Sequence, residues 1–223
     1  MPIRSGYHRT MILETRAVGP FYKNGYLLAC ETTREAIVID PGDEVGDLHE
    51  LAKARDLIVR HLLLTHGHVD HVAGVALAKR LFGAPVYLHR ADLPVYNSAV
   101  ETGEFFGLTI EQPPAPDRFY WECPPVTFGE FAVEVLPTPG HTPGGVCLHV
   151  THPEQGDCGL FVGDTLFAGS IGRTDLPGGD HQRLLASIRD VLLRFADEKV
   201  VYPGHGPQTT IGSERRTNPF LVS

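Results

Sequence analysis

The stretch that decides this fold reads Thr65-His66-Gly67-His68-Val69-Asp70-His71, and it directly follows the apolar run 57–64. Imidazole and carboxylate groups are ligands that zinc, iron and manganese accept. The chain has 12 histidines among 223 residues, so an isolated one would mean little. Three histidines and an aspartate at this spacing, in a turn between a predicted strand and a predicted helix, predict a metal site.

Composition indicates a globular protein of one domain, which we expect to span residues 1–223. Its 42% hydrophobic and 21% charged residues are ordinary for a soluble protein, and no Ser/Gly-rich linker divides the chain. The net charge of -8 disfavours nucleic acid as a partner. No apolar run approaches the length of a membrane span, and residues 1–8 lack the apolar stretch of a signal peptide. We therefore expect a cytoplasmic protein without a membrane partner.

The cysteines are scattered and form no CxxC pair, which predicts reduced, mostly buried thiols. They are Cys30, Cys123, Cys147 and Cys158. Nothing in the sequence sets the oligomeric state.

Apolar periodicity predicts the order of the elements. Strands are expected over 12–18, 26–30, 36–39, 57–64, 85–89, 131–136, 146–150, 159–162 and 199–202. Asn24-Gly25 is expected to form the turn of a first hairpin. Helices are expected over 45–55, 70–82, 91–97 and 180–196. This order is neither a strict alternation nor all-β, and it fits an α+β fold of four layers, with two packed sheets and helices outside.

Residues 98–125 show no periodicity and contain five prolines and five aromatic residues. A long irregular segment within a domain is usually functional or mobile. Two interpretations stay open: a loop that covers the substrate, and a surface excursion whose aromatic side chains cap the core.

Four predicted strands each end in potential metal ligands. Glycine and proline flank the later ones, which suits sharp turns that aim a side chain. Because catalytic groups gather on loops held at strand ends, we expect these side chains to meet. The candidate ligands are His66, His68, Asp70, His71, His141, Asp164 and His205.

Four motifs together resemble those of the metallo-β-lactamase superfamily: HxHxDH at 66–71, PGHTPG at 139–144, GDT at 163–165 and PGHG at 203–206. The resemblance extends from Gly19 to Leu221. It implies an αββα sandwich with two divalent metal ions between the sheets, zinc being favoured and iron or manganese also acceptable. The implied first site is His66, His68 and His141, and the implied second site is Asp70, His71 and His205, with Asp164 bridging both.

The same resemblance implies hydrolysis by a metal-bridging hydroxide. Two ions lower the pKa of a shared water, and one of them polarises the substrate carbonyl. Asp70 is the expected catalytic residue, as a ligand and as a hydrogen-bond acceptor that orients the hydroxide.

Segments 169–180, 204–210 and 214–219 look like those of compact glyoxalase II-like enzymes, similar to hydroxyacylglutathione hydrolases. The carboxylate of Asp164 disfavours the lactamases that have a cysteine ligand. Because the sequence reaches only Ser223, we expect it to lack the C-terminal helical domain of full-length glyoxalase II. We therefore expect hydrolysis of a small-molecule thioester or ester, with glutathione specificity left open.

The main alternative is a persulfide dioxygenase of the same superfamily, which the Gly-Arg-Thr-Asp segment 172–175 also resembles. That resemblance implies a single iron on His66, His141 and Asp164. An acyl-homoserine lactonase is a weaker alternative, and a nuclease conflicts with the negative charge.

Two further side chains are candidate substrate contacts, Arg173 and Tyr22. For Arg173 we favour a partly buried ion pair with Asp175. For Tyr22 and Tyr26 we favour core positions with a satisfied hydroxyl group.

Overall fold

Residues 11–222 are described in the computed structural model, and they form two six-stranded sheets and one small two-stranded sheet. The first sheet has the order β1 (Met11–Val18), β2 (Lys23–Cys30), β3 (Glu35–Ile39), β4 (Ile58–Leu63), β5 (Val86–Leu88) and β6 (Arg118–Phe119). The second has the order β14 (Thr209–Thr210), β13 (Val200–Pro203), β10 (Gly156–Gly163), β9 (Val146–His152), β8 (Phe131–Pro137) and β7 (Val126–Phe128). The third pairs β11 (Leu166–Phe167) with β12 (Ser170–Ile171).

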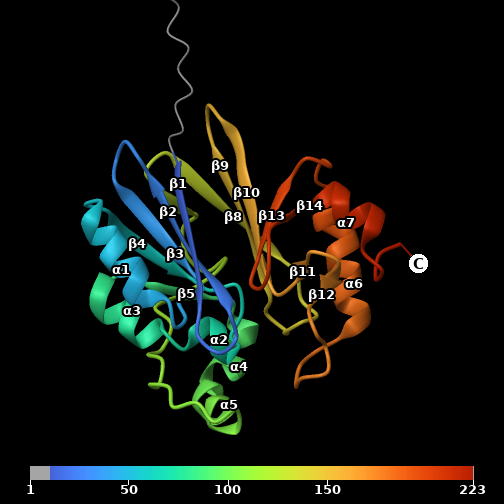
Figure 1. Cartoon of the computed structure of the whole chain (residues 1–223), viewed down its shortest axis with the longest axis horizontal. Coiled ribbons are helices and arrows are strands. Elements are labelled where there is room, and N and C mark those ends of the chain that lie inside the picture. Colours follow the sequence, from blue (N-terminus) through green and yellow to red (C-terminus); the bar gives the residue numbers. More distant parts are fainter. Residues whose placement is uncertain (1–10, 223) are drawn as a thin grey trace, which may run out of the picture.

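Helices lie along the outer faces of the two large sheets and at one end of the molecule (Figure 1). They are α1 (Val45–Ala54), α2 (Val69–Val72), α3 (Val75–Phe82), α4 (Leu93–Asn97), α5 (Ala99–Phe105), α6 (His181–Asp190) and α7 (Ile211–Thr217). Of these, α2, α4 and α5 lie at the end of the molecule. Strands β3 to β6 run parallel, so each connection must cross over the sheet, and α1 and α3 lie in two of these crossovers. Helices α6 and α7 lie on the other side of the molecule.

Alternating side chains of the strands divide the core into three layers. Leu27 of β2 faces α1 and α3, where it packs in one cluster with Leu48. Its neighbour Leu28 faces the second sheet and packs in the cluster that contains Phe161. A third cluster lies between the second sheet and α6. The expected four-layer αββα sandwich of the α+β class is confirmed.

The expected turn of the first hairpin was wrong. Asn24 and Gly25 lie within β2, paired with Ala17 and Arg16, and the turn is residues 19–22. Tertiary contacts explain the shift, because the Asn24 side chain donates hydrogen bonds to the carbonyl oxygens of Pro203 (3.0 Å) and Gly206 (2.8 Å). A side chain at Gly25 would collide with Glu44, so this glycine serves packing.

Other boundaries also differ from expectation. The helix expected over 70–82 is two helices, and Gly74 between them donates its backbone N–H to the Pro41 carbonyl (3.1 Å) and not to the preceding turn of the helix. The helix expected over 180–196 ends at Asp190, and a 3₁₀ turn, Leu192–Arg194, follows. The segment 98–125 contains α5 and β6, which the lost periodicity concealed.

The aromatic side chains of segment 98–125 differ in burial, and a role of this segment in covering the substrate stays a prediction. Tyr120 is buried and donates a hydrogen bond to the Leu64 carbonyl (3.1 Å), so it caps the core. Phe105, Phe106 and Trp121 are exposed. All four cysteines are unpaired, but only Cys30 and Cys147 are fully buried. Within residues 11–222, no helix is both long and apolar enough to cross a membrane.

Candidate metal centre

The seven candidate ligands meet where β4, β8, β10 and β13 end. Their donor atoms form three groups, within each of which the atoms lie within 4.8 Å of one another. The groups are His66, His68 and His141; His66, His71 and Asp164; and Asp70, His71 and His205. Residues from both large sheets therefore contribute to one cluster, as expected for loops at neighbouring strand ends.

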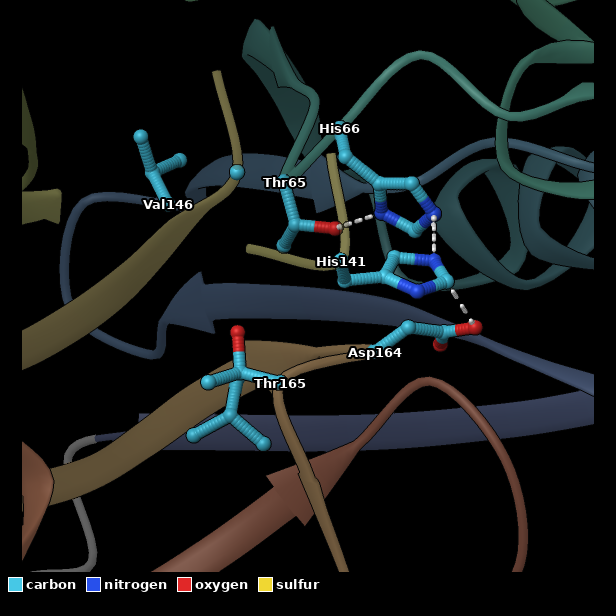
Figure 2. Close-up of a pocket in the computed structure, with 8 residues that line it drawn as sticks. Thr65, His66, His141, Val146, Asp164 and Thr165 are labelled. Carbon is cyan, nitrogen blue, oxygen red and sulfur yellow. Dashed lines mark hydrogen bonds and ion pairs between the residues drawn. The ribbon is translucent and has the colours of Figure 1, made fainter. Parts of the chain in front are cut away.

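The all-histidine group has the spacing of ligands around one ion. His141 Nε2 lies 3.3 Å from His66 Nε2 and 2.9 Å from His68 Nδ1. Tetrahedral zinc with bonds of about 2.0–2.1 Å separates its ligand nitrogens by about 3.4 Å. Figure 2 shows the two rings of His66 and His141 and then the Asp164 carboxylate lying one after another.

Asp164 lies between the other side chains of the cluster. Its carboxylate oxygens are 3.2 Å from His71 Nε2, 3.6 Å from His141 Nε2 and 3.5 Å from His205 Nε2. Asp70 extends the cluster on the far side, with Oδ2 at 3.0 Å from His205 Nε2. A carboxylate with two oxygens in this position can face two ions.

Buried atoms without partners show that a cation fits here. Among the described residues, His71 Nε2 and Asp164 Oδ1 have no hydrogen-bond partner, although they are buried and only 3.2 Å apart. Such atoms are costly to leave unsatisfied. The donors are imidazoles and carboxylates, which divalent zinc, iron and manganese accept.

The protonation of the cluster differs between its two sides. Burial lowers the pKa of His66 well below its ordinary value and that of His68 to about 4, so both rings stay neutral, which is the ligand form. Burial also opposes the charged form of His205, but hydrogen bonds to Asp164 and Asp70 outweigh it and raise the pKa to about 9. The carboxylates thus favour positive charge on the Asp70 side.

The chain matches the family model of the metallo-β-lactamase superfamily over residues 18–205. This chain belongs to that superfamily. Hydroxyacylglutathione hydrolase GloC of Haemophilus influenzae is 39% identical over 215 residues, which cover 96% of this chain and 99% of that protein.

Two solved structures are similar over nearly their whole length. TTHA1623 in a di-iron-bound form is 44% identical with a TM-score of 0.81, and the match covers 93% of this chain and 100% of that one. The BLEG-1 B3 metallo-β-lactamase is 36% identical with a TM-score of 0.83, over 95% of this chain and 100% of that one. The superfamily binds divalent metals, and the His/Asp cluster of this member fits such ions.

Backbone and side-chain acceptors orient the histidines of this superfamily member. His71 Nδ1 lies 3.0 Å from Asp40 Oδ2, and the Asp40 carboxylate also accepts hydrogen bonds from the backbone and hydroxyl groups of Thr65, both at 2.7 Å. His141 Nδ1 is 2.7 Å from the Arg173 carbonyl. Such partners set ring orientation and ligand basicity. In the sequence, Asp40 indicated only a turn, because one carboxylate before Pro-Gly is common in turns.

Asp92 joins the two loops that carry the all-histidine group. It is fully buried and accepts hydrogen bonds from Gly67 N (2.8 Å), Gly144 N (2.6 Å) and Thr142 Oγ1 (2.8 Å). Gly67 lies between His66 and His68, whereas Thr142 and Gly144 follow His141. Nothing in the local sequence distinguished this aspartate from a surface residue.

The structure shows where the two candidate substrate contacts, Arg173 and Tyr22, lie. Arg173 donates two hydrogen bonds of 2.7 Å to Asp175, so the expected ion pair is confirmed, but it is exposed rather than partly buried. Tyr26 is a core residue whose hydroxyl donates to the Pro203 carbonyl (2.6 Å), as expected. The core position expected for Tyr22 was wrong, because Tyr22 is at the hairpin turn and is 72% exposed. Substrate binding by Arg173 and Tyr22 stays a prediction.

Asp40→Asn is expected to weaken divalent-metal binding about 10- to 100-fold, because His71 loses a charged partner. Asparagine tolerates the left-handed backbone that Asp40 adopts (φ +51°), so the backbone strain is unchanged. Competition with a coloured chelator measures the affinity. Asp56→Asn is the matched control, since Asp56 has φ +52° but is exposed and precedes β4, whereas the ligand loop 66–71 follows the opposite end of that strand. Equal affinities of the two variants would contradict this role of Asp40.

Proposed function

We propose that this chain is a metal-dependent hydrolase of small-molecule thioesters or related esters, with S-lactoylglutathione-like substrates as the starting class. The observation that carries this proposal is the position of Asp164, which lies between an all-histidine group and a group containing Asp70 and His205. The similarity to the GloC hydrolase supports the thioester class.

The proposed ligand sets follow the groups in the cluster. His66, His68 and His141 would hold one ion, and Asp70, His71 and His205 would hold the other. Asp164 would be a ligand available to either ion. Two divalent ions at these positions would supply Lewis acidity that polarises the carbonyl and lowers the pKa of water.

The chain's own residues then position the reactants. Asp70 is the proposed catalytic residue, because its carboxylate faces the cluster and can accept a hydrogen bond from the attacking water. The water adds to the thioester carbonyl carbon, the C–S bond breaks, and the products are a carboxylic acid and a thiol. Asp40, Asp92 and the Arg173 carbonyl hold the loops and rings in place for this step.

The alternative is oxygenation of glutathione persulfide at a single iron. His66, His141 and Asp164 form a two-histidine, one-carboxylate set, with 3.3 Å and 3.6 Å between their donor atoms. Metal stoichiometry and oxygen uptake distinguish this reaction from hydrolysis.

Metal removal is expected to abolish thioester hydrolysis, and restoring a divalent ion is expected to recover it. The purified protein is treated with a chelator, dialysed, and reloaded separately with Zn²⁺, Fe²⁺ and Mn²⁺. Each form is assayed with lactoylglutathione, glutathione persulfide, an acyl-homoserine lactone and a β-lactam. One iron per chain, with oxygen uptake on the persulfide and no thioester cleavage, would overturn the hydrolase proposal.

A further inference from the structure

A hollow of about 100 Å³ adjoins the cluster on the Asp70 side. Six of the nine residues that line it are apolar, namely Pro20, Phe21, Val69, Ala73, Leu108 and Ile110, and the other three are Asp43, Asp70 and Thr109. Water beside the six apolar residues finds no side-chain hydrogen-bond partner there, so an apolar group gains free energy by replacing it.

Four segments build this hollow. They are the turn 19–22, the loop between β3 and α1, helix α2 with the residue that follows it, and the residues after α5. The rings of Phe21 and Phe106 meet edge to face at 5.7 Å and join the first segment to the fourth. Leu108 is held by a hydrogen bond from its backbone N to the Gly103 carbonyl (2.9 Å). Part of segment 98–125 therefore lines the hollow beside the metal centre.

The hollow is continuous with the proposed catalytic residue. Asp70 lines it and also belongs to the group with His71 and His205. Phe21 lines it as well, and its carbonyl oxygen is 3.1 Å from His205 Nδ1. A substituent on the reacting carbonyl can therefore enter the hollow.

Charge decides which half of a thioester fits. Among residues 11–222, the charged side chains of the wall are Asp43 and Asp70, and none of the lining residues is lysine or arginine. An anionic group, such as the carboxylates of a glutathione moiety or a dicarboxylic acyl group, would be repelled. Arg173, by contrast, lies on the other side of the cluster, where its carbonyl oxygen contacts His141 Nδ1. The hollow thus suits the uncharged acyl half.

We propose that this hollow binds the acyl chain, and that the preferred substrate carries a short, uncharged, straight aliphatic acyl group of about four carbons. The size follows from the volume, since a hollow of about 100 Å³ holds roughly three groups of the size of water or methylene beyond the carbonyl. This inference rests on the proposed thioester hydrolysis and names its acyl group.

The first measurement is kcat/KM for acyl groups on one constant thiol, namely S-acetyl-, S-lactoyl-, S-butanoyl-, S-succinyl- and S-octanoylglutathione. Each buried methylene changes kcat/KM about fourfold, so butanoyl, with two more methylenes, is expected to exceed acetyl by roughly 15-fold. Succinyl and octanoyl are expected to fall below butanoyl, because of charge and length respectively.

Leu108→Ala tests the wall itself. It is expected to raise the octanoyl-to-butanoyl ratio of kcat/KM about tenfold, because the smaller alanine side chain lengthens the hollow. A general structural defect would lower both rates together and leave the ratio unchanged. Leu77→Ala is the matched control, because Leu77 is a partly exposed leucine on α3 outside the hollow. It is expected to leave the ratio unchanged.

Binding of S-methyl-, S-butyl- and S-octylglutathione, measured by calorimetry, needs no turnover and separates the two proposals. Tightest binding of S-butyl, with the preference shifted to S-octyl in Leu108→Ala, supports the hollow even if no thioester is cleaved. The acyl-binding proposal would be overturned if thioesters were cleaved with the same kcat/KM for every acyl group and all three thioethers bound equally well to both proteins. That result would leave the hydrolase proposal unaffected.

Discussion

Asp164→Ala is expected to lower kcat/KM for thioester hydrolysis by about 10³-fold or more, with the fold retained. Loss of one oxyanion-stabilising donor costs about 10²–10³-fold in enzymes, and Asp164 contacts His71, His141 and His205 at once. Removing it takes away the carboxylate that faces both proposed ions. Steady-state kinetics and the metal content of the reconstituted protein measure the effect. His66→Ala is expected to lower kcat/KM by a similar factor, with the fold retained.

The matched control is Asp190→Ala, because Asp190 is an exposed residue at the end of α6. It is expected to keep both activity and metal. Thermal unfolding of each variant shows whether the fold is retained. An Asp164→Ala protein that stays folded and hydrolyses thioesters at the original rate would refute the mechanism.

Lys23→Met is expected to lower the free energy of unfolding by about 3–5 kcal/mol, since it leaves a buried charge without its partner. Lys23 Nζ lies 2.8 Å from Glu44 Oε1, and the two side chains are 3% and 0% exposed. The ammonium group also donates to the Asp40 carbonyl. Glu44 in turn accepts a hydrogen bond from Gly42 N (2.8 Å). Urea denaturation measures the loss.

Two further variants test whether the unpaired buried charge causes the loss of stability. The double variant Lys23→Met/Glu44→Gln is expected to recover part of the loss, because no unpaired charge remains buried. Lys79→Met removes the partner of Asp117 in a half-exposed pair and is expected to cost about 0–1 kcal/mol. Similar losses for Lys23→Met and Lys79→Met would mean that burial does not control the strength of the first pair.

The apolar pattern of the sequence predicted most of the long strands and the sandwich, because a strand buried on both faces, such as β3, is a continuous apolar run, whereas one with an exposed face, such as β8, alternates. The exceptions are informative. Asn24-Gly25 has the composition of a hairpin turn, yet Asn24 bonds to residues near His205 and Gly25 leaves room for Glu44. The short strands β6, β7 and β14 have two or three residues each, too few to show a period.

The candidate ligands were recognisable because several lie together in sequence or stand in glycine- and proline-rich turns. Asp40 and Asp92 were not, although each holds ligand loops through its carboxylate. A single aspartate in a turn has the same local sequence whether it is solvated or buried. Only packing distinguishes these cases, because burial and hydrogen-bond partners come from distant segments.

The sequence by itself determined which side chains could bind metal and in which turns they stand, since strand periodicity and turn chemistry are local. The tertiary structure alone decided that His66 and His141, 75 positions apart, lie 3.3 Å from each other. It alone placed Asp164 between the two groups and Phe21 beside Leu108 at the hollow. The physical reason is that packing of the two sheets sets these distances, and that packing depends on apolar burial summed over the whole chain.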